Sequence, residues 1–214
     1  MKLFIYMIKM KRIIIPILIM CILFSGCISG EDDTGTYDGD LGDLLIDQAY
    51  LPDGYLPDDC IGGDTDYSED LAEYGYIEDA RVYYKITIEN EDSVTETMFF
   101  QNVIRFDKEK AADYLEHITS FTEEWYTITA NETAEDWSST YEPYEHDTIG
   151  DVSVVAIATI IRDTEDDSAF ANSQQYYVSF VKKDIAVNIQ GNDSDERLGI
   201  EELIDLARDI ADRI

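Results

Sequence analysis

The sequence predicts an α+β fold, in which an antiparallel sheet is flanked by helices and closed by a C-terminal helix. Three observations predict it. Stretches in which apolar residues alternate with polar ones follow one another between residues 82 and 106, a pattern typical of strands. Two later apolar runs flank a short polar turn at residues 182–184, as in a β-hairpin. Near the C-terminus, apolar residues recur every three or four positions, as in an amphipathic helix.

The first two strands are expected at residues 82–88 and 95–106, with a turn at residues 90–93 between them. Alternation places one set of side chains of the first strand on a common face: Val82, Tyr84, Ile86 and Ile88. The second strand has a similar set: Met98, Phe100, Ile104 and Phe106. Asp107 follows, and its carboxylate suits the N-cap of a helix because it accepts hydrogen bonds from the free N–H groups of the first turn.

A helix is expected from Lys108 to about Ser120, because apolar side chains recur within it at helical spacing. These side chains are Ala111, Tyr114, Leu115 and Ile118. The next stretch, residues 121–149, is rich in threonine, glutamate and aromatic residues, and it predicts neither a helix nor a strand. The aromatic residues between Trp125 and Tyr144 pack on the sheet or form a ligand face, and both interpretations stay open.

The last third of the chain predicts three more strands and the closing helix. Gly150 and Asp151 precede an apolar run at residues 152–161, which lacks alternation and therefore indicates a central strand covered on both faces. Residues 176–189 form a hairpin around the turn Lys182-Lys183-Asp184. The terminal helix runs from about Ile200 to Arg213. Its apolar stripe consists of Ile200, Leu203, Ile204, Ala207, Ala211 and Ile214.

The segment before these elements is strongly acidic. Residues 30–80 contain 17 acidic residues and no lysine or arginine. High charge and frequent glycine oppose a packed core, so we expect residues 27–75 to form a disordered acidic tether and loop ahead of an ectodomain at residues 76–214. Within the tether, Leu51–Tyr55 predicts a turn, because proline fixes φ and Asp-Gly suits the following positions. Leu44–Ile46 is a candidate short amphipathic turn that docks on the domain.

The start of the chain indicates the cellular location of the protein. Four basic residues precede an apolar run of about a dozen residues, which ends in Phe24-Ser25-Gly26-Cys27. This order resembles the signal peptide and lipobox of a prokaryotic surface lipoprotein, although Phe24 stands where that family usually has Leu, Val or Ile. The resemblance implies that residues 1–26 are removed and that Cys27 is the lipid-attachment site on the extracytoplasmic face of the cell membrane. The run is shorter than the ~20 residues that span a bilayer, and an uncleaved single-pass anchor stays the alternative.

Beyond residue 41, several structural marks occur together: a Pro-Gly turn, a strand that runs into a helix, a Gly-Asp before a strand, a hairpin and a closing helix. This arrangement resembles uncharacterised prokaryotic lipoproteins with a PsbP-like α/β sandwich. The resemblance implies an antiparallel sheet with helices on its sides, and it implies no catalytic residue. The hairpin turn departs from the usual Gly-Asn. The matching segments are residues 51–55, 106–118, 150–151, 180–184 and 206–208.

Charge excludes some partners. The sequence has a net charge of −32, and since residues 1–26 contain four basic and no acidic residues, the remainder carries −36. Such a surface repels nucleic acid and anionic head groups, so no nucleic-acid partner is expected, whereas weak binding of divalent cations stays open. Cys60 is the one cysteine after Cys27. No internal disulfide is therefore expected, and the fold must rest on its core.

The sequence assigns no catalytic, metal-binding or cofactor-binding residue. His117 and His146 are the two histidines of the chain, and neither has another His or Cys nearby at the spacing of a zinc site. Two acidic runs, residues 38–43 and 64–70, lack the glycine and glutamate positions of an EF-hand loop and indicate solvated charge. Motifs for a serine nucleophile or a phosphate-binding loop are absent from the sequence.

These observations favour a membrane-anchored, extracytoplasmic lipoprotein that acts as a non-enzymatic binding or accessory module, with a protein or small-ligand partner of unknown identity. The alternative is an exported accessory enzyme or enzyme subunit, a carboxylate-dependent hydrolase. A shaped cleft with two convergent carboxylates would favour the hydrolase. A flat aromatic patch without a cleft would favour the binding module.

Overall fold

The computed structural model describes residues 35–58, 69–89, 94–107, 110–132, 137–162, 173–192 and 197–214. Residues 35–214 form one compact unit. Cys27 and Cys60 lie outside the described residues, as do the expected turn at 90–93 and residues 64–68 of the second acidic run. Within the described part of the chain, no helix combines the length and apolar character needed to cross a membrane.

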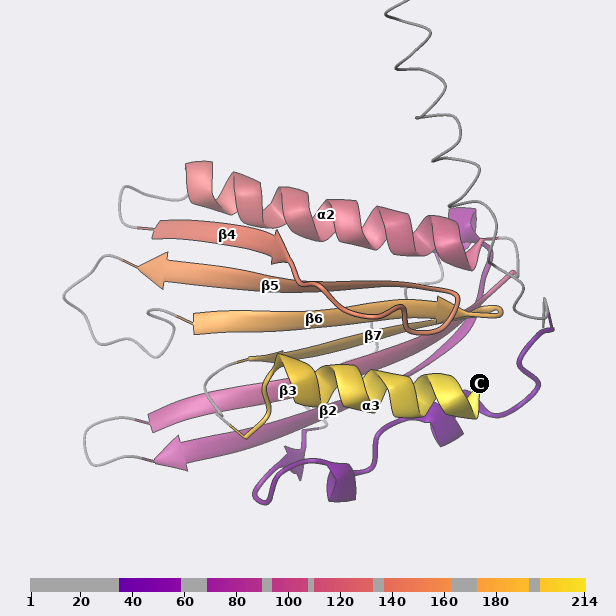
Figure 1. Cartoon of the computed structure of the whole chain (residues 1–214), viewed down its shortest axis with the longest axis horizontal. Coiled ribbons are helices and arrows are strands. Elements are labelled where there is room, and N and C mark those ends of the chain that lie inside the picture. Colours follow the sequence, from indigo (N-terminus) through magenta and orange to yellow (C-terminus); the bar gives the residue numbers. More distant parts are fainter. Residues whose placement is uncertain are drawn as a thin grey trace, which may run out of the picture. The chain divides into compact units, whose positions relative to one another are not determined.

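The described residues confirm the predicted α+β class. Seven strands form a sheet in the order β1-β2-β3-β7-β6-β5-β4, and each neighbouring pair is antiparallel (Figure 1). The strands are β1 (Leu56–Pro57), β2 (Tyr76–Glu89), β3 (Val94–Phe106), β4 (Trp137–Pro143), β5 (Val152–Arg162), β6 (Ser173–Lys182) and β7 (Ile185–Asn192).

Within the described residues, two α-helices flank the sheet, α2 (Ala111–Glu132) and α3 (Ile200–Arg213). Helix α2 runs along β4, and α3 contacts β6 and β7 (Figure 1). Helix α3 confirms the predicted closing helix, and at its start the N–H of Gly199 donates to Glu202 Oε2 at 3.0 Å. Short 3-10 helices precede β2 in the chain: η1 (Leu41–Leu44), η2 (Gln48–Tyr50) and η3 (Ala72–Tyr74).

Helix α2 is longer than predicted, because it continues to Glu132 whereas the sequence indicated an end near Ser120. Tyr126, 2% exposed, extends its buried stripe by two turns beyond the predicted core residues. Hydroxyl residues in the helix weaken the apolar pattern, but the hydroxyls of Thr119 and Thr122 donate to carbonyls four residues earlier, at 2.8 and 2.7 Å. Such bonds pair the hydroxyls within the helix, and the burial of Tyr126 holds this polar segment helical, because packing supplies most of a helix's stability in a protein.

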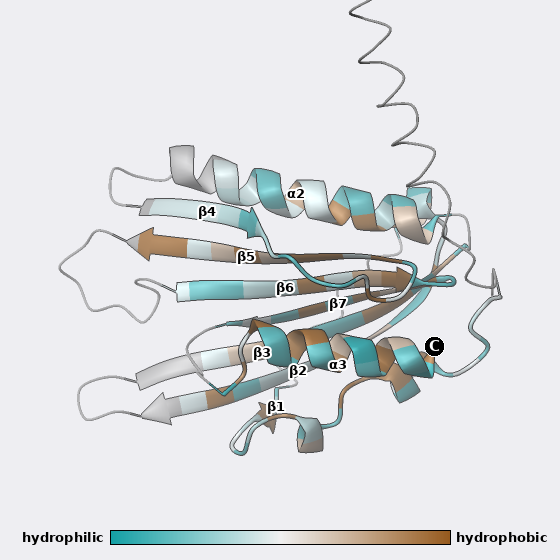
Figure 2. Cartoon of the chain, in the orientation of Figure 1, coloured by the Kyte–Doolittle hydropathy of each residue, from teal (hydrophilic) through white to brown (hydrophobic). Residues whose placement is uncertain are grey.

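One face of the sheet, which we call the α3 face, is a sealed apolar core packed against α3. Its central residues are at most 1% exposed, and apolar burial at ~25 cal/mol per Å² makes this face the main source of stability. Figure 2 shows hydrophobic residues along β5 and an alternation of both colours on α3, as expected of an amphipathic helix. The central sheet residues are Phe99, Val103, Val178, Phe180, Ile185, Val187 and Ile189.

Apolar residues of the segment 35–57 join this core, which corrects the expectation of a disordered tether for that segment. Leu44 and Ile46 are buried against the α3 face, so the predicted docking turn is confirmed. Gln101 of β3 holds it: the Oε1 atom accepts a hydrogen bond from the N–H of Ile46 at 2.7 Å, and Nε2 donates to the carbonyl of Leu44 at 3.0 Å. A few well-spaced apolar residues dock the segment, whereas the many acids between them dominate its composition.

The predicted strand faces are also confirmed. Three residues of β2 share the α3 face: Val82, Tyr84 and Ile86. The predicted set on β3 lies on the opposite face, where Ile104 and Phe106 are buried. Strand β5 is an interior strand with both faces covered, because Val155 joins the α3-face core and Val154 packs against the cluster under α2.

The hairpin β6–β7 turns at Lys183, as predicted, with a φ of 58°. Gly150, before β5, has a φ of 63°, and a Cβ atom there would lie 2.5 Å from the carbonyl oxygen of Val181. The position therefore requires glycine. Asp151 binds the hairpin twice: its N–H donates to the Val181 carbonyl at 2.8 Å, and its Oδ2 atom accepts from the N–H of Lys183 at 2.8 Å.

Candidate functional site

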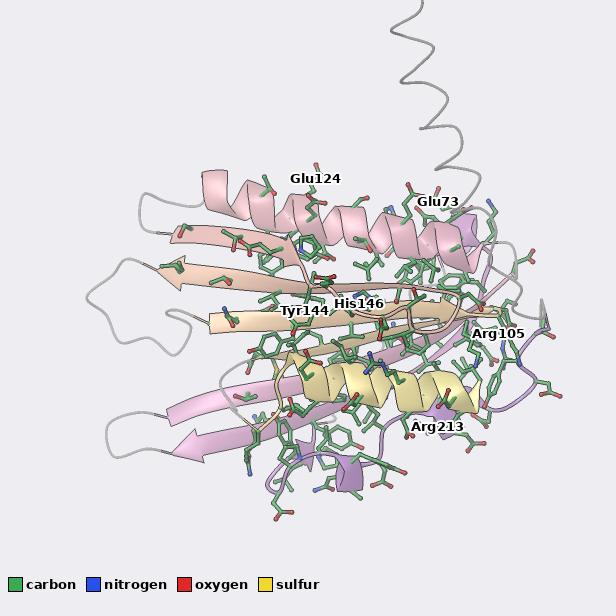
Figure 3. All side chains as sticks on the ribbon, in the orientation of Figure 1. Glu73, Arg105, Glu124, Tyr144, His146 and Arg213 are labelled. Carbon is green, nitrogen blue, oxygen red and sulfur yellow. The ribbon has the colours of Figure 1, made fainter. Side chains whose placement is uncertain are left out.

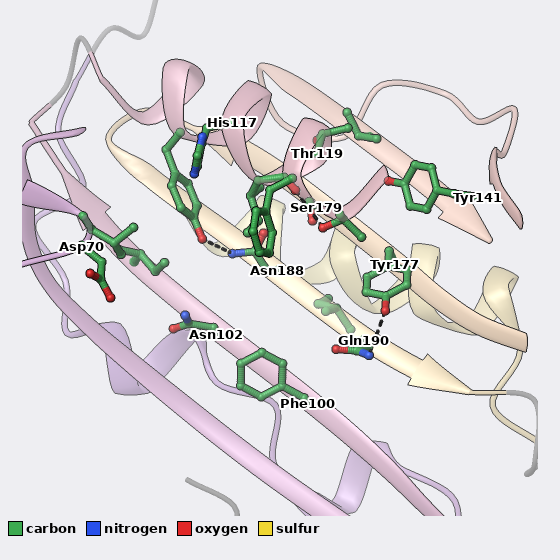
Figure 4. A pocket seen from close by; sticks show the side chains of 18 residues that line it. Asp70, Phe100, Asn102, His117, Thr119, Tyr141, Tyr177, Ser179, Asn188 and Gln190 are labelled. Atoms are coloured by element: carbon green, nitrogen blue, oxygen red, sulfur yellow. Dashed lines mark hydrogen bonds between the residues drawn. The ribbon is translucent and has the colours of Figure 1, made fainter. Parts of the chain in front are cut away.

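The opposite face of the sheet, which we call the α2 face, is closed at one end and hollow beyond it. An apolar cluster near the start of α2 closes the end: Ile104, Phe106, Ala111, Tyr114, Leu115, Val181 and Ala186. Beyond this cluster, α2 and the sheet enclose a cavity of about 510 Å³ (Figure 4). This volume lies within the range of ~300–1,000 Å³ typical of small-molecule sites.

The cavity lining combines aromatic rings with uncharged polar groups. The rings belong to Phe100, Tyr114, Phe121, Tyr141 and Tyr177. The polar side chains include Asn102, Thr119, Thr122, Ser179, Asn188 and Gln190. Among the described lining residues, Asp70 is the one carboxylate and His117 the one histidine, and the lining contains no lysine or arginine. Most of the lining is therefore neutral.

The same strands build the sealed core and the hollow face, because successive side chains of a strand point to opposite faces. On β3, Asn102 lines the cavity, whereas its neighbours Gln101 and Val103 are buried on the α3 face. On β7, Asn188 lines the cavity between two residues of the apolar core, Val187 and Ile189. The rigid core thus fixes the backbone from which the cavity side chains project.

Two asparagines face each other on the floor of the cavity. Asn102 of β3 and Asn188 of β7 are direct partners in the antiparallel register. The Nδ2 atom of Asn188 donates to the hydroxyl of Tyr114 at 3.3 Å. The Oδ1 atoms of both asparagines are buried without a hydrogen-bond partner, and Asn102 is only 7% exposed. A buried polar atom without a partner costs about 1–3 kcal/mol, so a ligand that donates hydrogen bonds here would be favoured.

The other end of the cavity contains a complete hydrogen-bond network. Gln175 Oε1 accepts from Gln190 Nε2 at 3.1 Å and lies 2.6 Å from the hydroxyl oxygen of Tyr126 and 2.7 Å from that of Tyr177. The two hydroxyl oxygens lie 2.6 Å apart, and because each phenol has one proton, two protons serve these three oxygen contacts. Burial raises the pKa of both tyrosines. The network therefore holds neutral hydroxyls in fixed positions, in contrast to the unpaired asparagine oxygens.

His117, which lines the cavity, is surrounded by aromatic rings. The ring of His117 lies 5.1 Å from that of Tyr74 and 6.4 Å from that of Phe121. Phe121 and Trp125 of α2 are 55% and 49% exposed. Within the described residues, no three His, Cys, Asp or Glu side chains are grouped so that they could hold a metal ion.

His146 is not part of the cavity lining and lies in the connection between β4 and β5 (Figure 3). Its Nδ1 atom lies 3.0 Å from the carbonyl oxygen of Tyr144 and donates to it, because a carbonyl only accepts. Nε2 then accepts from the hydroxyl of Ser153 at 2.9 Å. The same hydroxyl oxygen accepts from the N–H of Ile149 at 2.9 Å. These bonds fix the connection between the strands.

One residue of the aromatic stretch that the sequence left open contributes to this site. Within the aromatic stretch left open between Trp125 and Tyr144, Tyr141 lines the cavity, whereas Tyr126 is buried in the packing beneath α2. Sequence reasoning missed Asn102 and Asn188. A signal for Asn102 exists, since it is polar although Phe100 and Ile104, its neighbours on the same face, are apolar.

The first acidic run acts locally in the described structure. Asp40 caps η1, because its Oδ1 atom accepts a hydrogen bond from the N–H of Gly42 at 2.7 Å. Of the second run, Asp70 lines the cavity. The lipid-attachment residue expected at Cys27 lies outside the described residues, so lipidation stays a prediction.

Comparison with known protein families and with curated proteins finds no match. Among solved structures, the chain is similar to the extracellular domain of PknH from Mycobacterium tuberculosis. The TM-score is 0.46 and the sequence identity 15%, over 81% of this chain and 93% of that chain. The PsbP-like resemblance stays a prediction, and the proposals below rest on the residues of this chain alone.

Proposed function

We propose that this protein is a non-enzymatic, extracytoplasmic binding module, held at the membrane by a lipid on Cys27, whose cavity under α2 takes a small amphipathic ligand. One observation carries the proposal: a cavity of about 510 Å³ has aromatic walls and a floor where the Oδ1 atoms of Asn102 and Asn188 lack partners. Buried polar atoms are nearly always paired in folded proteins. An unpaired couple in a cavity therefore favours a binding role over a purely structural one.

The same cavity helps to choose between the two functions that the sequence left open, a binding module and a carboxylate-dependent hydrolase. A carboxylate-dependent hydrolase needs two convergent carboxylates, and the described lining contributes only Asp70. A flat aromatic patch was the expected mark of the binding module, but Phe100, Tyr141 and Tyr177 line a hollow, which fits a small molecule better than the face of a protein. A small molecule is therefore the partner that best fits the site.

Charge agrees with this assignment. Beyond residue 26 the chain carries a net charge of −36, which disfavours nucleic acid and anionic head groups. Attachment to the membrane then depends on the lipid rather than on the protein surface. Divalent cations would bind weakly to the exposed acids and would screen their mutual repulsion.

The binding proposal is tested by filling the cavity. In the variant Ser179→Phe, an aromatic ring projects from β6 into the cavity, whereas Thr127→Phe adds the same ring on the exposed side of α2. A panel of small amphipathic molecules is screened by thermal shift against the full-length protein. We expect hits that stabilise the parent and Thr127→Phe but not Ser179→Phe. Hits that stabilise all three proteins equally, or a panel without hits, would contradict the proposal.

The anchor is tested separately with Cys27→Ser. Cells that express the parent or the variant are fractionated after a high-salt wash. We expect the parent to stay with the membrane and the variant to remain an unprocessed precursor or to enter the soluble extracytoplasmic fraction. A variant that is processed normally and stays as firmly bound as the parent would contradict lipidation at Cys27.

A further inference from the structure

We infer that the ligand of the cavity carries a positively charged amine and that this group binds between Asn102 and Asn188. The inference rests on the proposed function and adds the chemical class of the ligand. It starts from the atoms that lack partners: both are amide oxygens, Oδ1 of Asn102 and Oδ1 of Asn188. Both atoms accept hydrogen bonds and donate none.

The register brings the two acceptors together. Asn102 and Asn188 are opposite each other on adjacent antiparallel strands, where opposed Cβ atoms are about 4.5–5.5 Å apart. Two side-chain oxygens at this separation can converge on one donor group. An ammonium offers three donors and no acceptor, whereas a hydroxyl offers one donor. The pair of oxygens therefore suits an ammonium better than a hydroxyl.

The surroundings favour positive charge. The described lining has no lysine or arginine, and Asp70 is its one carboxylate. The register partner of Asn102 on β2 is Arg81, but its charge is balanced, since Nε and Nη2 lie 2.9 and 2.7 Å from Asp79 Oδ2. An amine would thus enter a site without a competing free cation in its lining.

Aromatic faces and the overall field add to this preference. Phe100 lines the cavity along with Asn102 and Asn188 (Figure 4), and Tyr114 also belongs to the lining. The negative face of an aromatic ring attracts a cation within ~6 Å of its centre. The strongly negative chain, with a net charge of −32, concentrates cations near the surface and repels anions. An anionic ligand has no counter-charge in this lining.

The test compares two molecules that differ only in the group concerned. Tyramine carries an ammonium where tyrosol carries a hydroxyl on the same phenylethyl frame. Full-length protein in zwitterionic nanodiscs is titrated with each by calorimetry, with empty nanodiscs as blank. We expect tyramine to bind about tenfold more tightly than tyrosol, because charge-assisted hydrogen bonds are stronger than neutral ones. Asn102→Leu and Asn188→Leu should each weaken tyramine binding by about tenfold, whereas Thr127→Val, on the exposed side of α2, should leave it unchanged.

The outcomes separate this inference from the proposed function. If tyrosol binds as tightly as tyramine or more tightly, and Ser179→Phe blocks it, the cavity binds ligands but the amine inference falls. If neither molecule binds, the amine inference falls, and the panel screen decides the proposed function. If a leucine variant fails to fold, Asn102→Ala replaces it, and unchanged tyramine binding in that variant would also overturn the inference.

Discussion

The two faces of the sheet differ in a way that separates stability from recognition. On the α3 face, Phe99, Val103 and Phe180 are fully buried, and Gln101 has partners for both amide atoms, although the buried hydroxyl of Thr97 nearby on β3 has none. On the α2 face, Asn102 and Asn188 are also buried or half-buried, but their Oδ1 atoms have no partners. Both faces are built by the same strands.

The comparison teaches that neighbouring residues of one strand serve different ends. A sealed face keeps the backbone rigid, and a rigid backbone holds the side chains of the other face in position. The hollow face can then carry unpaired polar atoms, which lower the stability of the fold but leave hydrogen-bonding capacity for a ligand. Substitutions on the two faces should therefore change the free energy of unfolding by different amounts and, for Asn102, in the opposite direction.

The largest difference is expected between neighbours on β6. Phe180→Ala should lower the free energy of unfolding by about 3–5 kcal/mol, because it leaves a void in the sealed core. Ser179→Ala, on the cavity side, should change it by less than about 0.5 kcal/mol. Urea unfolding of both variants measures the difference. Similar losses in both would contradict the division between the faces.

A smaller difference is expected between two glutamines. Gln101→Ala should lower the free energy of unfolding by about 2–3 kcal/mol, because it removes both bonds that hold Leu44 and Ile46 and leaves buried backbone groups unpaired. Gln190→Ala, on the α2 face of β7, should cost less than about 1 kcal/mol. Urea unfolding checks both values, and limited proteolysis should cut the N-terminal segment faster only in Gln101→Ala. Equal proteolysis rates would show that Gln101 does not anchor this segment.

Local patterns of the sequence predicted most of the sheet. Alternation in β2 and β3 and the helical stripe of α3 are signals within a few residues, and each was confirmed. The docking of this segment was predicted only for Leu44–Ile46. Its partner Gln101 was not predicted, because it lies more than fifty positions away in the chain. The full length of α2 was missed because its second half is rich in threonine, a composition typical of loops. In the structure, the hydroxyls of Thr119 and Thr122 bond to the backbone of the helix.

The candidate site was harder to predict than the fold. Asn102 and Asn188 are 86 positions apart in the sequence, and only the pairing of β3 with β7 brings them together. Neither belongs to a motif. The sequence alone could show that the chain is acidic and rich in tyrosine, but it could not show which polar residues share a cavity, because that depends on strand order.

Alkaline pH should weaken the α2 face through its tyrosines. Burial raises the pKa of Tyr177 above the ordinary value of 10.0. The unfolded chain then loses this proton at a lower pH than the folded chain does. The stability linked to Tyr177 is thus complete below pH 10 and is lost as the pH rises above it, by at most about 1.4 kcal/mol per pH unit. Tyr177→Phe should flatten this decline in urea unfolding between about pH 8 and about pH 11. A parallel decline in parent and variant would contradict the assignment.

The smallest expected change in the free energy of unfolding is an increase. Asn102→Leu should raise the free energy of unfolding by about 1 kcal/mol, because it removes a buried carbonyl oxygen without a partner and adds apolar surface beside Phe100 and Ile104. The reverse change on the other face of the same strand, Val103→Asn, should cost several-fold more, since it buries an amide in the sealed core. Urea unfolding of both variants checks the pair. Tyramine binding should fall in Asn102→Leu although the protein is more stable, and this opposition distinguishes a residue kept for a ligand from one kept for the fold. A marked loss of stability in Asn102→Leu would instead show that Asn102 holds the sheet together.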